Sequence, residues 1–572
     1  MNEPQGGKKR AVNFSMFSIL KIQNALIALC LCAVLCLWAG MSSAVIFQVT
    51  TSEEFQAALA AASENGADDE IILAAGPYLG GFKFLAKENY ALTLSGAELD
   101  VNGRPTTLLD AQSGSFALLI DGDGFNSAIS ISRISLANTN QSSAAALFMR
   151  KIPTLVNLHE VLVQDARGEA GIRLNTVDSL KAENLEVSFV TGDAIQLEDV
   201  AESQLQGLSI QDVNGRGIFY EINVNRDGCC DARSILRLEK SQILRVQQTG
   251  LDHYLFPGGL GNAARILEVD GTRFEEVGTA IKTFVNGEMK SIVATDNHFV
   301  EVGAALNLNL FAAPHSNVLV RRNRIYGSVE VKGGDFLLSN GDRPRGILQF
   351  TDNLISTDRF SVGGAFINEI SLVNNTIVGL AGGLDLVSDD ETRIFVQNNI
   401  FWGRDSEAVV NQVGIPEYSV LRNNLIAENS SYWDISTSNL SGDPKFFDPA
   451  RDDYHLAEGS PLIDAGLLSD LTDDSSYDLD GNPRVLNGAV DIGAYERSTT
   501  ALHPADTNGD NSISQEEFDA YNLAWRENDK WTSPPEVIPV DFVTRAGFLR
   551  QKGGTYKNIG VGKPQTWVPV ND

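Results

Sequence analysis

The chain has 572 residues and carries 44 Lys and Arg against 74 Asp and Glu, a formal net charge of −30. A field of that sign repels nucleic acid and anionic membrane surfaces, so neither is an expected partner. It also disfavours acidic polysaccharides unless a cation or a local basic spot intervenes.

Residues 1–44 are typical of a targeting segment. Basic residues between Lys8 and Lys21 precede an apolar stretch from Ala25 to Trp38, and small residues at 42–44 suit a cleavage site. The apolar stretch is shorter than the ~20 residues of a membrane span. We therefore expect a protein that is secreted or displayed at the cell surface. Residues 1–44 are then either a cleaved signal peptide or an N-terminal membrane anchor.

Cys229 and Cys230 are the only cysteines that follow this segment. One adjacent pair excludes a disulfide framework and a Cys-based zinc site. The sequence leaves open whether the pair forms a vicinal disulfide or remains two thiols in a loop.

A short helix is predicted close to the start of the expected mature chain. Residues 52–75 break the strand-like pattern, and within them residues 52–62 form an amphipathic stretch that Ser52 opens as its capping residue. Stacked-repeat folds need an element that covers the open end of the coil. We expect this helix to cover the N-terminal end.

A motif of Asn, one further residue, and Ile or Phe recurs in the second half of the chain at intervals of 22 to 30 residues. Self-similarity at this period indicates stacked repeats rather than one globular core. The intervening segments are short and alternate apolar with polar residues, as half-buried strands do. They predict an all-β solenoid, a right-handed parallel β-helix over residues 45–497. The Leu-x-x-Leu-x-Leu frame of the competing leucine-rich repeat is missing.

The repeated Asn residues are expected at equivalent turns, stacked as a ladder inside the coil. Asn tolerates left-handed backbone geometry, and its side-chain amide can satisfy backbone groups at a turn. The ladder is predicted to comprise Asn297, Asn323, Asn353, Asn375, Asn399 and Asn424.

A second series of small residues, each followed by an aliphatic residue, marks one strand in every turn. Because side chains alternate along a strand, the residue after each aliphatic points outward, and neighbouring rungs lie ~4.8 Å apart. The series predicts one outward column made of Arg173, Gln196, Phe219, Asp252, Lys282, Asn307, Glu330 and Asp385.

Lys282 and Asp252 are neighbours in this column, and with His253 and Arg173 they form the candidate catalytic group. A Lys near a carboxylate can abstract a proton next to a sugar carboxylate. The alternative is a solvated sheet face held by cross-rung ion pairs, each of which contributes little. Any groove is expected over the column between Arg173 and Glu330.

Residues 443–497 differ in character and carry a series of motifs: Asp443-Pro-Lys-Phe446, Tyr454-His-Leu456, Gly459-Ser-Pro-Leu-Ile-Asp-Ala-Gly466, Asp478-Leu-Asp-Gly-Asn-Pro-Arg484 and Asp491-Ile-Gly-Ala-Tyr-Glu496. This order resembles the C-terminal end of bacterial surface proteins called choice-of-anchor Q domain proteins. The resemblance spans roughly residues 45–497. It implies a right-handed parallel β-helix of the pectin-lyase-like class, with 443–497 as its C-terminal cap. Some members of that class are polysaccharide lyases or glycosidases.

The acidic stretch Asp470–Asp480 invites a calcium interpretation, but Ala489 stands where the closing Glu of such a loop would be needed. We favour a turn-rich terminal rung over a second calcium site.

Residues 506–517 match the frame of a calcium-binding EF-hand loop. Such a loop supplies oxygen ligands from positions 1, 3, 5, 7, 9 and 12. Asn511 stands at position six, where the backbone takes a positive φ. Ser514 and Glu517 also form a capping box for a following helix. The predicted ligands of one Ca²⁺ ion are Asp506, Asn508, Asp510, Ser512, Ser514 and Glu517.

No entering helix precedes the loop, so residues 498–572 resemble a dockerin-like or other short EF-hand module rather than a full helix-loop-helix. A second loop has decayed, with Val537, Pro539 and Gly547 at three ligand positions, and is predicted to be a packing partner without metal. Calcium is expected to order this module and to leave the β-helix largely unchanged.

Three functions stay open: a calcium-binding β-helix that recognises a polysaccharide or surface glycan, a polysaccharide lyase or glycosidase, and a structural or adhesive surface protein. An enzyme requires close acids and bases beneath a groove, a binder requires exposed aromatic platforms, and a structural protein requires neither. A monomer is expected.

Overall fold

The computed structural model describes residues 44–570 apart from 224–232, 257–264, 287–288, 313–315, 334–345, 365–366, 382, 404–407, 428–431, 472–475, 487, 498–501, 534, 536 and 560–561. The predicted targeting segment and the Cys229–Cys230 pair lie outside the described residues. None of the described helices is long and apolar enough to cross a membrane.

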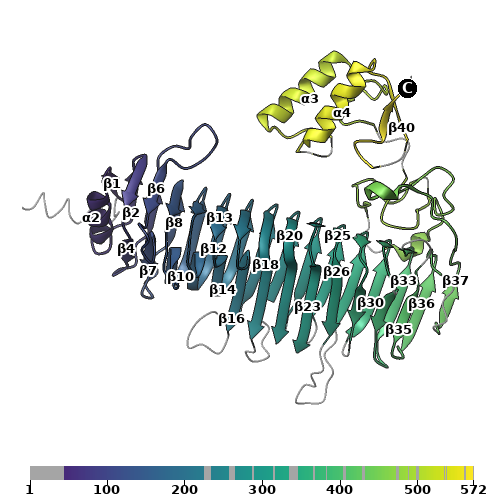
Figure 1. Ribbon diagram of the computed structural model, residues 1–572, viewed down its shortest axis with the longest axis horizontal. Coiled ribbons are helices and arrows are strands. Elements are labelled where there is room, and N and C mark those ends of the chain that lie inside the picture. Colours follow the sequence, from purple (N-terminus) through teal and green to yellow (C-terminus); the bar gives the residue numbers. More distant parts are fainter. Residues whose placement is uncertain are drawn as a thin grey trace, which may run out of the picture.

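The main body is a right-handed parallel β-helix whose strands form three faces (Figure 1). The first face contains β4 (Phe82–Leu85), β7 (Leu118–Asp121), β10 (Ala145–His159), β12 (Ala170–Glu183), β14 (Asp193–Gln206), β16 (Ile218–Asn223), β18 (Gln242–Phe256), β20 (Arg273–Asn286), β23 (Ala304–Ala312), β26 (Ser328–Gly333), β29 (Phe360–Gly363), β32 (Leu384–Val387) and β35 (Val410–Val413).

The second face begins with the N-terminal strand and runs the length of the coil. It contains β1 (Val45–Val49), β2 (Asp69–Leu73), β5 (Leu92–Ser95), β8 (Ile129–Ser132), the ends of β10, β12 and β14, then β17 (Ser234–Glu239), β19 (Arg265–Asp270), β21 (Ser291–Thr295), β24 (Asn317–Arg321), β27 (Gly346–Thr351), β30 (Ile367–Val373), β33 (Arg393–Gln397), β36 (Tyr418–Arg422) and β37 (Ile435–Thr437).

The third face follows the second after a tight turn. It contains β3 (Gly76–Leu79), β6 (Thr107–Asp110), β9 (Ile134–Ala137), β11 (Leu162–Gln164), β13 (Glu186–Val190), β15 (Ser209–Val213), the starts of β18 and β20, then β22 (His298–Val300), β25 (Arg324–Tyr326), β28 (Leu354–Ser356), β31 (Thr376–Val378) and β34 (Ile400–Trp402).

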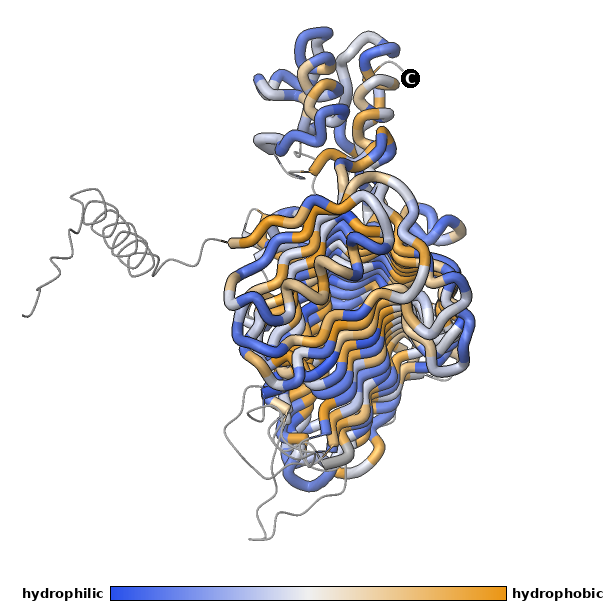
Figure 2. Tube along the Cα trace, turned by 90° about the vertical axis from the view of Figure 1, so that its left-hand side faces the viewer, coloured by the Kyte–Doolittle hydropathy of each residue, from blue (hydrophilic) through white to orange (hydrophobic). Residues whose placement is uncertain are grey.

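Alternation along each strand builds the interior. In β23, Leu306 and Leu308 are buried inside the coil, whereas Asn307 between them faces outward. Viewed along the coil, the rungs superpose, and apolar and polar stripes continue from rung to rung (Figure 2). The predicted fold class is confirmed.

The turn between the second and third faces carries the predicted asparagine ladder. From Asn323 onward, each Asn accepts the backbone N–H of the preceding ladder Asn at 2.9–3.1 Å, and each donates its amide to the next side chain. Asn297, the first, accepts the Thr272 amide at 2.9 Å. Asn439 extends the ladder by one further rung beyond Asn424. The six predicted Asn residues therefore occupy equivalent turns, as expected.

One detail of the ladder prediction is wrong. The left-handed residue is the one before each ladder Asn, such as Asp352 (φ 59°) before Asn353 and Asn398 (φ 56°) before Asn399. The preceding residue makes the turn, and the ladder Asn then points inward, where its amide satisfies the carbonyls that the turn leaves unpaired.

Helix α2 (Ser52–Ala62) packs on the N-terminal rungs through Phe55 and Leu59. Its N-cap is Thr51 rather than Ser52, because Thr51 and Glu54 form a reciprocal capping box.

Residues 443–497 do not continue the coil, contrary to our expectation of a terminal rung. The last parallel pairing joins Leu425 to Leu440. Beyond it, β38 (Phe446–Asp448) and β39 (Asp453–Leu456) pair antiparallel with each other. A short 3-10 turn, Pro449–Arg451, connects them, and a second one, Leu468–Asp470, lies further along the segment.

This segment instead packs along the flank of the last rungs, against the ladder turn (Figure 1). Asn398 exchanges two hydrogen bonds with Leu467, and the Ala494 amide donates to Thr376. Arg484, fully buried, pairs with Asp352 of the ladder turn. The segment packs here because the left-handed residues that precede the ladder Asn residues, such as Asp352 and Asn398, offer polar groups along this flank.

The C-terminal module contains α3 (Gln515–Glu527), α4 (Val540–Gln551), β40 (Tyr556–Asn558) and β41 (Trp567–Pro569) around its own apolar core. Residues 540–547 form a helix, so the segment read as the end of a decayed loop is not a loop. It is a packing partner, as predicted, because Gly547 lies next to the Phe518 ring of α3.

Candidate functional site

An open groove follows the turn between the third and first faces, across several rungs. Two adjoining hollows of about 670 Å³ and about 590 Å³ share Asp165 and Arg167. We call them together the corner groove, and its lining comprises Asp110, Gln112, Ser113, Asn138, Thr139, Asn140, Asp165, Arg167, Phe189, Val190, Thr191, Asp212, Val213, Asn214, Arg245, Val246, Gln247 and Glu276.

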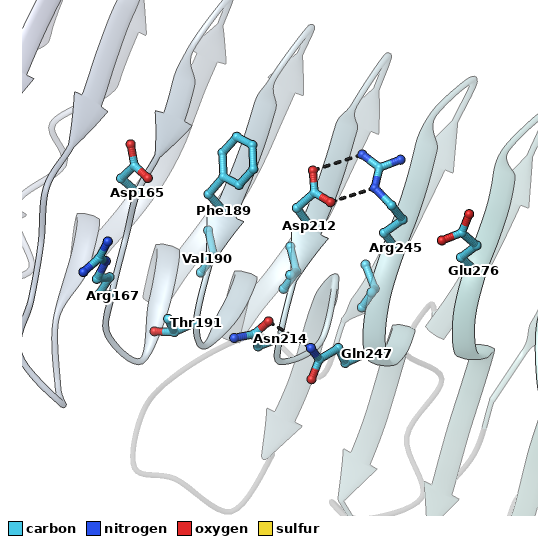
Figure 3. A pocket seen from close by; sticks show the side chains of 12 residues that line it. Asp165, Arg167, Phe189, Val190, Thr191, Asp212, Asn214, Arg245, Gln247 and Glu276 are labelled. Carbon is cyan, nitrogen blue, oxygen red and sulfur yellow. Dashed lines mark hydrogen bonds and ion pairs between the residues drawn. The ribbon is translucent and has the colours of Figure 1, made fainter.

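One side of the corner groove is a column of left-handed residues on successive rungs. Asp165, Phe189, Asp212, Arg245 and Glu276 all have φ between 52° and 56°. Their side chains project from the same edge (Figure 3). Left-handed geometry suits Asn and Asp, so a bulky aromatic residue in this column is an outlier.

Phe189 is that outlier, and its side chain is not used for packing. The residue is 57% exposed, and no ring or cation contact joins its ring to another part of the described chain. It stands between Asp165 and Asp212, one rung from each (Figure 3). Backbone strain combined with an exposed aromatic ring indicates a function outside the fold.

Buried Val190, Val213 and Val246 lie beneath the column and hold its geometry by rung-to-rung packing. Arg245 donates two hydrogen bonds to Asp212, at 2.7 and 3.0 Å, and its guanidinium lowers the pKa of that carboxyl. An apolar ring among amides and charged groups suits a ligand with apolar ring faces and many hydroxyls.

The predicted outward column on the first face is present in the expected register. Direct pairings join Arg173 to Gln196, Phe219 to Asp252, Asp252 to Lys282 and onward to Glu330. Ser361 is an additional rung between Glu330 and Asp385. Lys282 Nζ lies 3.6 Å from Asp252 Oδ1, well within the expected separation.

The polar centre of this column is a cluster around Asp252, which is only 4% exposed. The Arg216 guanidinium forms ion pairs with Asp193 at 2.6 Å and with Asp252 at 3.5 Å, and it lies over the Phe219 ring. Lys282 donates to the Tyr254 hydroxyl at 2.8 Å. Burial raises the pKa of Asp252, although Lys282 and Arg216 oppose the shift.

Two members of the predicted catalytic group lie elsewhere. His253 points into the coil, fully buried and stacked on Tyr220, and burial lowers its pKa to about 4. Alternation itself requires this, because His253 follows the outward Asp252. Arg173 is three rungs from Asp252 and pairs with Glu169 and Glu198.

Sequence reasoning missed Arg216, Asp193 and Tyr254. Tyr254 could have been found, since it is two residues beyond Asp252 and must face the same side. Arg216 lies at the turn before its strand, so only the folded turn reveals that it reaches Asp252.

The groove was expected over the first-face column, but the hollows described lie at the neighbouring corner. Long side chains on the column fill the space above the sheet by pairing across rungs, as Arg216 does over Phe219. At the corner, the left-handed residues splay outward and leave the Val residues at the bottom of a trough.

The predicted calcium loop turns as expected at position six, where Asn511 has φ 61°. Asp506 accepts the amides of Gly509 and Asn511, and Glu517 accepts those of Thr507 and Ser514. Ser514 and Glu517 form the predicted capping box. These carboxylates are engaged by the loop backbone, and within the described ranges no three His, Cys, Asp or Glu residues converge on a metal position.

The acids of Asp470–Asp480 that the structure describes are also engaged. Asp470 pairs with Arg422, Asp478 accepts three backbone amides, and Asp480 pairs with Arg324 and His455. Asp470 and Asp480 hold the flank segment to the coil through Arg422 and Arg324, whereas the contacts of Asp478 lie within the segment.

The sequence matches no family model and no curated protein. Solved structures with a similar fold include a pectate lyase, Pel9A, at 12% identity and TM-score 0.27, covering 80% of this chain and 98% of that one. The A-module of mannuronan C-5 epimerase AlgE4 from Azotobacter vinelandii has 12% identity and TM-score 0.29, covering 68% and 100%. The PL6 family alginate lyase AlyGC has 12% identity and TM-score 0.31, covering 80% and 60%. At these values we base no argument about function on the similarities.

Proposed function

We propose that this protein recognises a polysaccharide chain laid along the corner groove. The observation that carries the proposal is Phe189, an exposed ring held in a strained backbone conformation within a column whose other members, Asp165, Asp212, Arg245 and Glu276, are all charged. Sugar rings have apolar faces that pack on an aromatic ring, and their hydroxyls match the amides and carboxylates beside it. A groove that crosses successive rungs, ~4.8 Å apart, suits a linear chain.

The ligand class that fits best is a neutral glycan. The lining carries four acids, Asp110, Asp165, Asp212 and Glu276, against Arg167 and Arg245, so its own charge disfavours an acidic glycan. Arg245 pairs with Asp212. The net charge of −30 opposes a polyanion in the absence of a cation.

Phe189→Asn tests this function directly. Asn suits the left-handed position, so we expect the variant to gain about 1 kcal/mol of stability. Loss of the ring should weaken glycan binding about tenfold, or ~1.4 kcal/mol. The measurement is affinity electrophoresis and calorimetry on a panel of neutral and uronic polysaccharides, with urea unfolding alongside.

The matched control is Phe447→Asn, which removes an exposed ring (46% exposed) far from the corner groove and should leave binding unchanged. Equal glycan affinity in wild type and Phe189→Asn, or no glycan bound by wild type, would contradict the proposal.

We also propose that residues 506–517 bind one Ca²⁺ ion. Asp506, Asp510 and Glu517 would supply carboxylates, Asn508 an amide oxygen, and Ser512 and Ser514 the remaining oxygens. The left-handed Asn511 and the return of Glu517 to the start of the loop support the fit. The ion would replace the amide contacts of these carboxylates and supply charge neutralisation.

Glu517→Gln should weaken calcium binding by about an order of magnitude or more, because it removes the charge of the bidentate ligand and keeps the shape. Calorimetry of the full chain with calcium is the measurement. Glu516→Gln, the same change at the adjacent exposed residue, is the control. Identical calcium affinity in the Glu517 and Glu516 variants would place any site elsewhere.

A second candidate function is chemistry at the Asp252 cluster, in a polysaccharide lyase or glycosidase. The observation in its favour is a buried carboxylate flanked by two cations, with Lys282 donating to the Tyr254 hydroxyl. A polysaccharide panel should then yield unsaturated products or new reducing ends. Lys282→Met should reduce the rate at least tenfold, and Lys332→Met on the exposed part of the same face should not. Absence of products from every polysaccharide would remove this candidate.

Three further proposals concern the whole chain. They are export to the medium or the cell surface, the choice-of-anchor Q relationship of residues 443–497, and a monomeric state.

A further inference from the structure

The C-terminal module touches the flank segment 443–497 near Gly562 and Ile559. Gly562 lies so near the His455 ring that a Cβ on it would be 3.0 Å from Cε1 and 3.5 Å from Asp453 Oδ2. Three residues earlier, the Ile559 carbonyl accepts a hydrogen bond of 3.5 Å from Arg497. Only a residue without a side chain fits this contact as it stands.

His455 is a fixed surface for this contact. Its ring is held between Asp453 at 2.6 Å and Asp480 at 3.0 Å, and it stacks on Tyr495 at 3.9 Å between ring centres. Asp480 also pairs with Arg324 of β25, at 2.6 Å. His455, which Gly562 contacts, is therefore connected to the coil through Asp480 and its ion pair with Arg324.

The same strand that leads to Gly562 forms the back of the proposed calcium loop. The Tyr556 hydroxyl donates to Asp506 Oδ2 at 2.7 Å and accepts from the His503 amide. Ser512 bridges to Thr555, and the Ile513 amide donates to the Gly554 carbonyl at 3.0 Å.

Asp506 is the first predicted calcium ligand, so these contacts form a continuous path. It joins Asp506 to Tyr556 of β40 (Tyr556–Asn558), and Ile559 and Gly562, which follow β40 in the chain, meet Arg497 and His455 of the flank segment. Any shift of the loop on metal binding moves the Tyr556 strand, because backbone and hydroxyl contacts both join them.

We propose that calcium in loop 506–517 and docking of the module on the flank segment are coupled through Tyr556 and Gly562, so that the ion locks the module onto the β-helix. This inference rests on the proposed calcium site. It revises the expectation that the body of the protein is indifferent to calcium. Because coupling is reciprocal, loss of docking must weaken calcium binding by the same factor.

The test uses the full chain, with calcium titrated by calorimetry and backbone amide exchange measured over 453–456 and 493–497. Gly562→Val introduces a side chain where the His455 ring stands and should prevent docking. We expect it to weaken calcium affinity about fivefold or more, although residue 562 lies outside the loop. Calcium should slow amide exchange around His455 in wild type and not in this variant.

Lys557→Ala, an exposed change on the same strand, is the control and should match wild type in both measurements. Gly562→Ala makes a smaller intrusion and should give an intermediate affinity, which guards against a folding defect in the Val variant. Tyr556→Phe removes the hydroxyl link and should abolish the calcium-dependent protection near His455.

Equal calcium affinity in wild type and Gly562→Val would overturn the coupling and leave the calcium site standing. Absence of calcium binding in wild type would overturn both proposals.

Discussion

Replacement of Arg484 by Met is expected to lower the stability of the flank segment by about 3–5 kcal/mol, because it leaves buried carboxylates without their counter-charge. Arg484 is fully buried and pairs with Asp352 of the coil and, at 3.3 Å, with Glu496. Burial, with Asp491 nearby, already raises the pKa of Glu496 to about 8. The side chain therefore joins two segments of the chain that are far apart in sequence.

The loss should depend on pH in a defined direction. A buried acid with a raised folded pKa lowers the free energy of unfolding as pH rises from its unfolded pKa, about 4.3 for Glu, to its folded pKa. Above the folded pKa the penalty is complete, and below the unfolded pKa it is absent. Removal of Arg484, which lowers the pKa of Glu496, raises the folded pKa of that acid further, so the deficit should be larger at about pH 8 than at about pH 5.

Urea unfolding of the full chain, followed by fluorescence and by amide exchange over 476–497, measures the effect. The control is Arg451→Met, since Arg451 is an exposed residue with one surface ion pair and should contribute less than ~1 kcal/mol. A similar small loss at both positions would show that Arg484 does not hold the segment.

Asn375→Ala should cost about 3 kcal/mol or more, because it interrupts the asparagine ladder in the interior. The Asn375 side chain accepts the Asn353 amide at 3.0 Å and donates to the Phe350 carbonyl at 2.7 Å and to Asn399 Oδ1 at 3.0 Å. Each buried partner left unpaired costs roughly 1–3 kcal/mol.

Asn439→Ala at the end of the ladder is the matched control. Asn439 makes the same type of contacts to Asn424, but it lies at the last rung, where solvent reaches the freed groups. We expect less than half the loss measured for Asn375→Ala. Equal losses would show that burial within the stack is not what makes the ladder stabilising.

The ladder and the outward column could both be predicted from the sequence. Asn323 and Asn353 recur with the rung, and the period of two along each strand fixes which side Asp252 and Lys282 face. Because each rung repeats the one before it, local pattern and long-range position carry the same information in a solenoid. The same period of two places His253, the residue after the outward Asp252, inside the coil, so the sequence already excluded it from the catalytic group.

Local pattern alone could not locate the groove, the flank packing or the path to Gly562. Phe189 lies within β13 (Glu186–Val190), and only the fold reveals that Asp165 and Asp212 stand one rung to either side. Arg484 meets Asp352 across 132 residues of chain, and Gly562 meets His455 between two segments without a common repeat.

The sequence by itself determined the β-helix, the Asn ladder and the register of the outward column, because periodic burial dictates them. The tertiary structure decided which corner is open, that residues 443–497 pack on the flank, and how the C-terminal module meets them. The physical reason is that these features depend on how unlike side chains fill space between segments distant in the chain, and no period of the sequence encodes that packing.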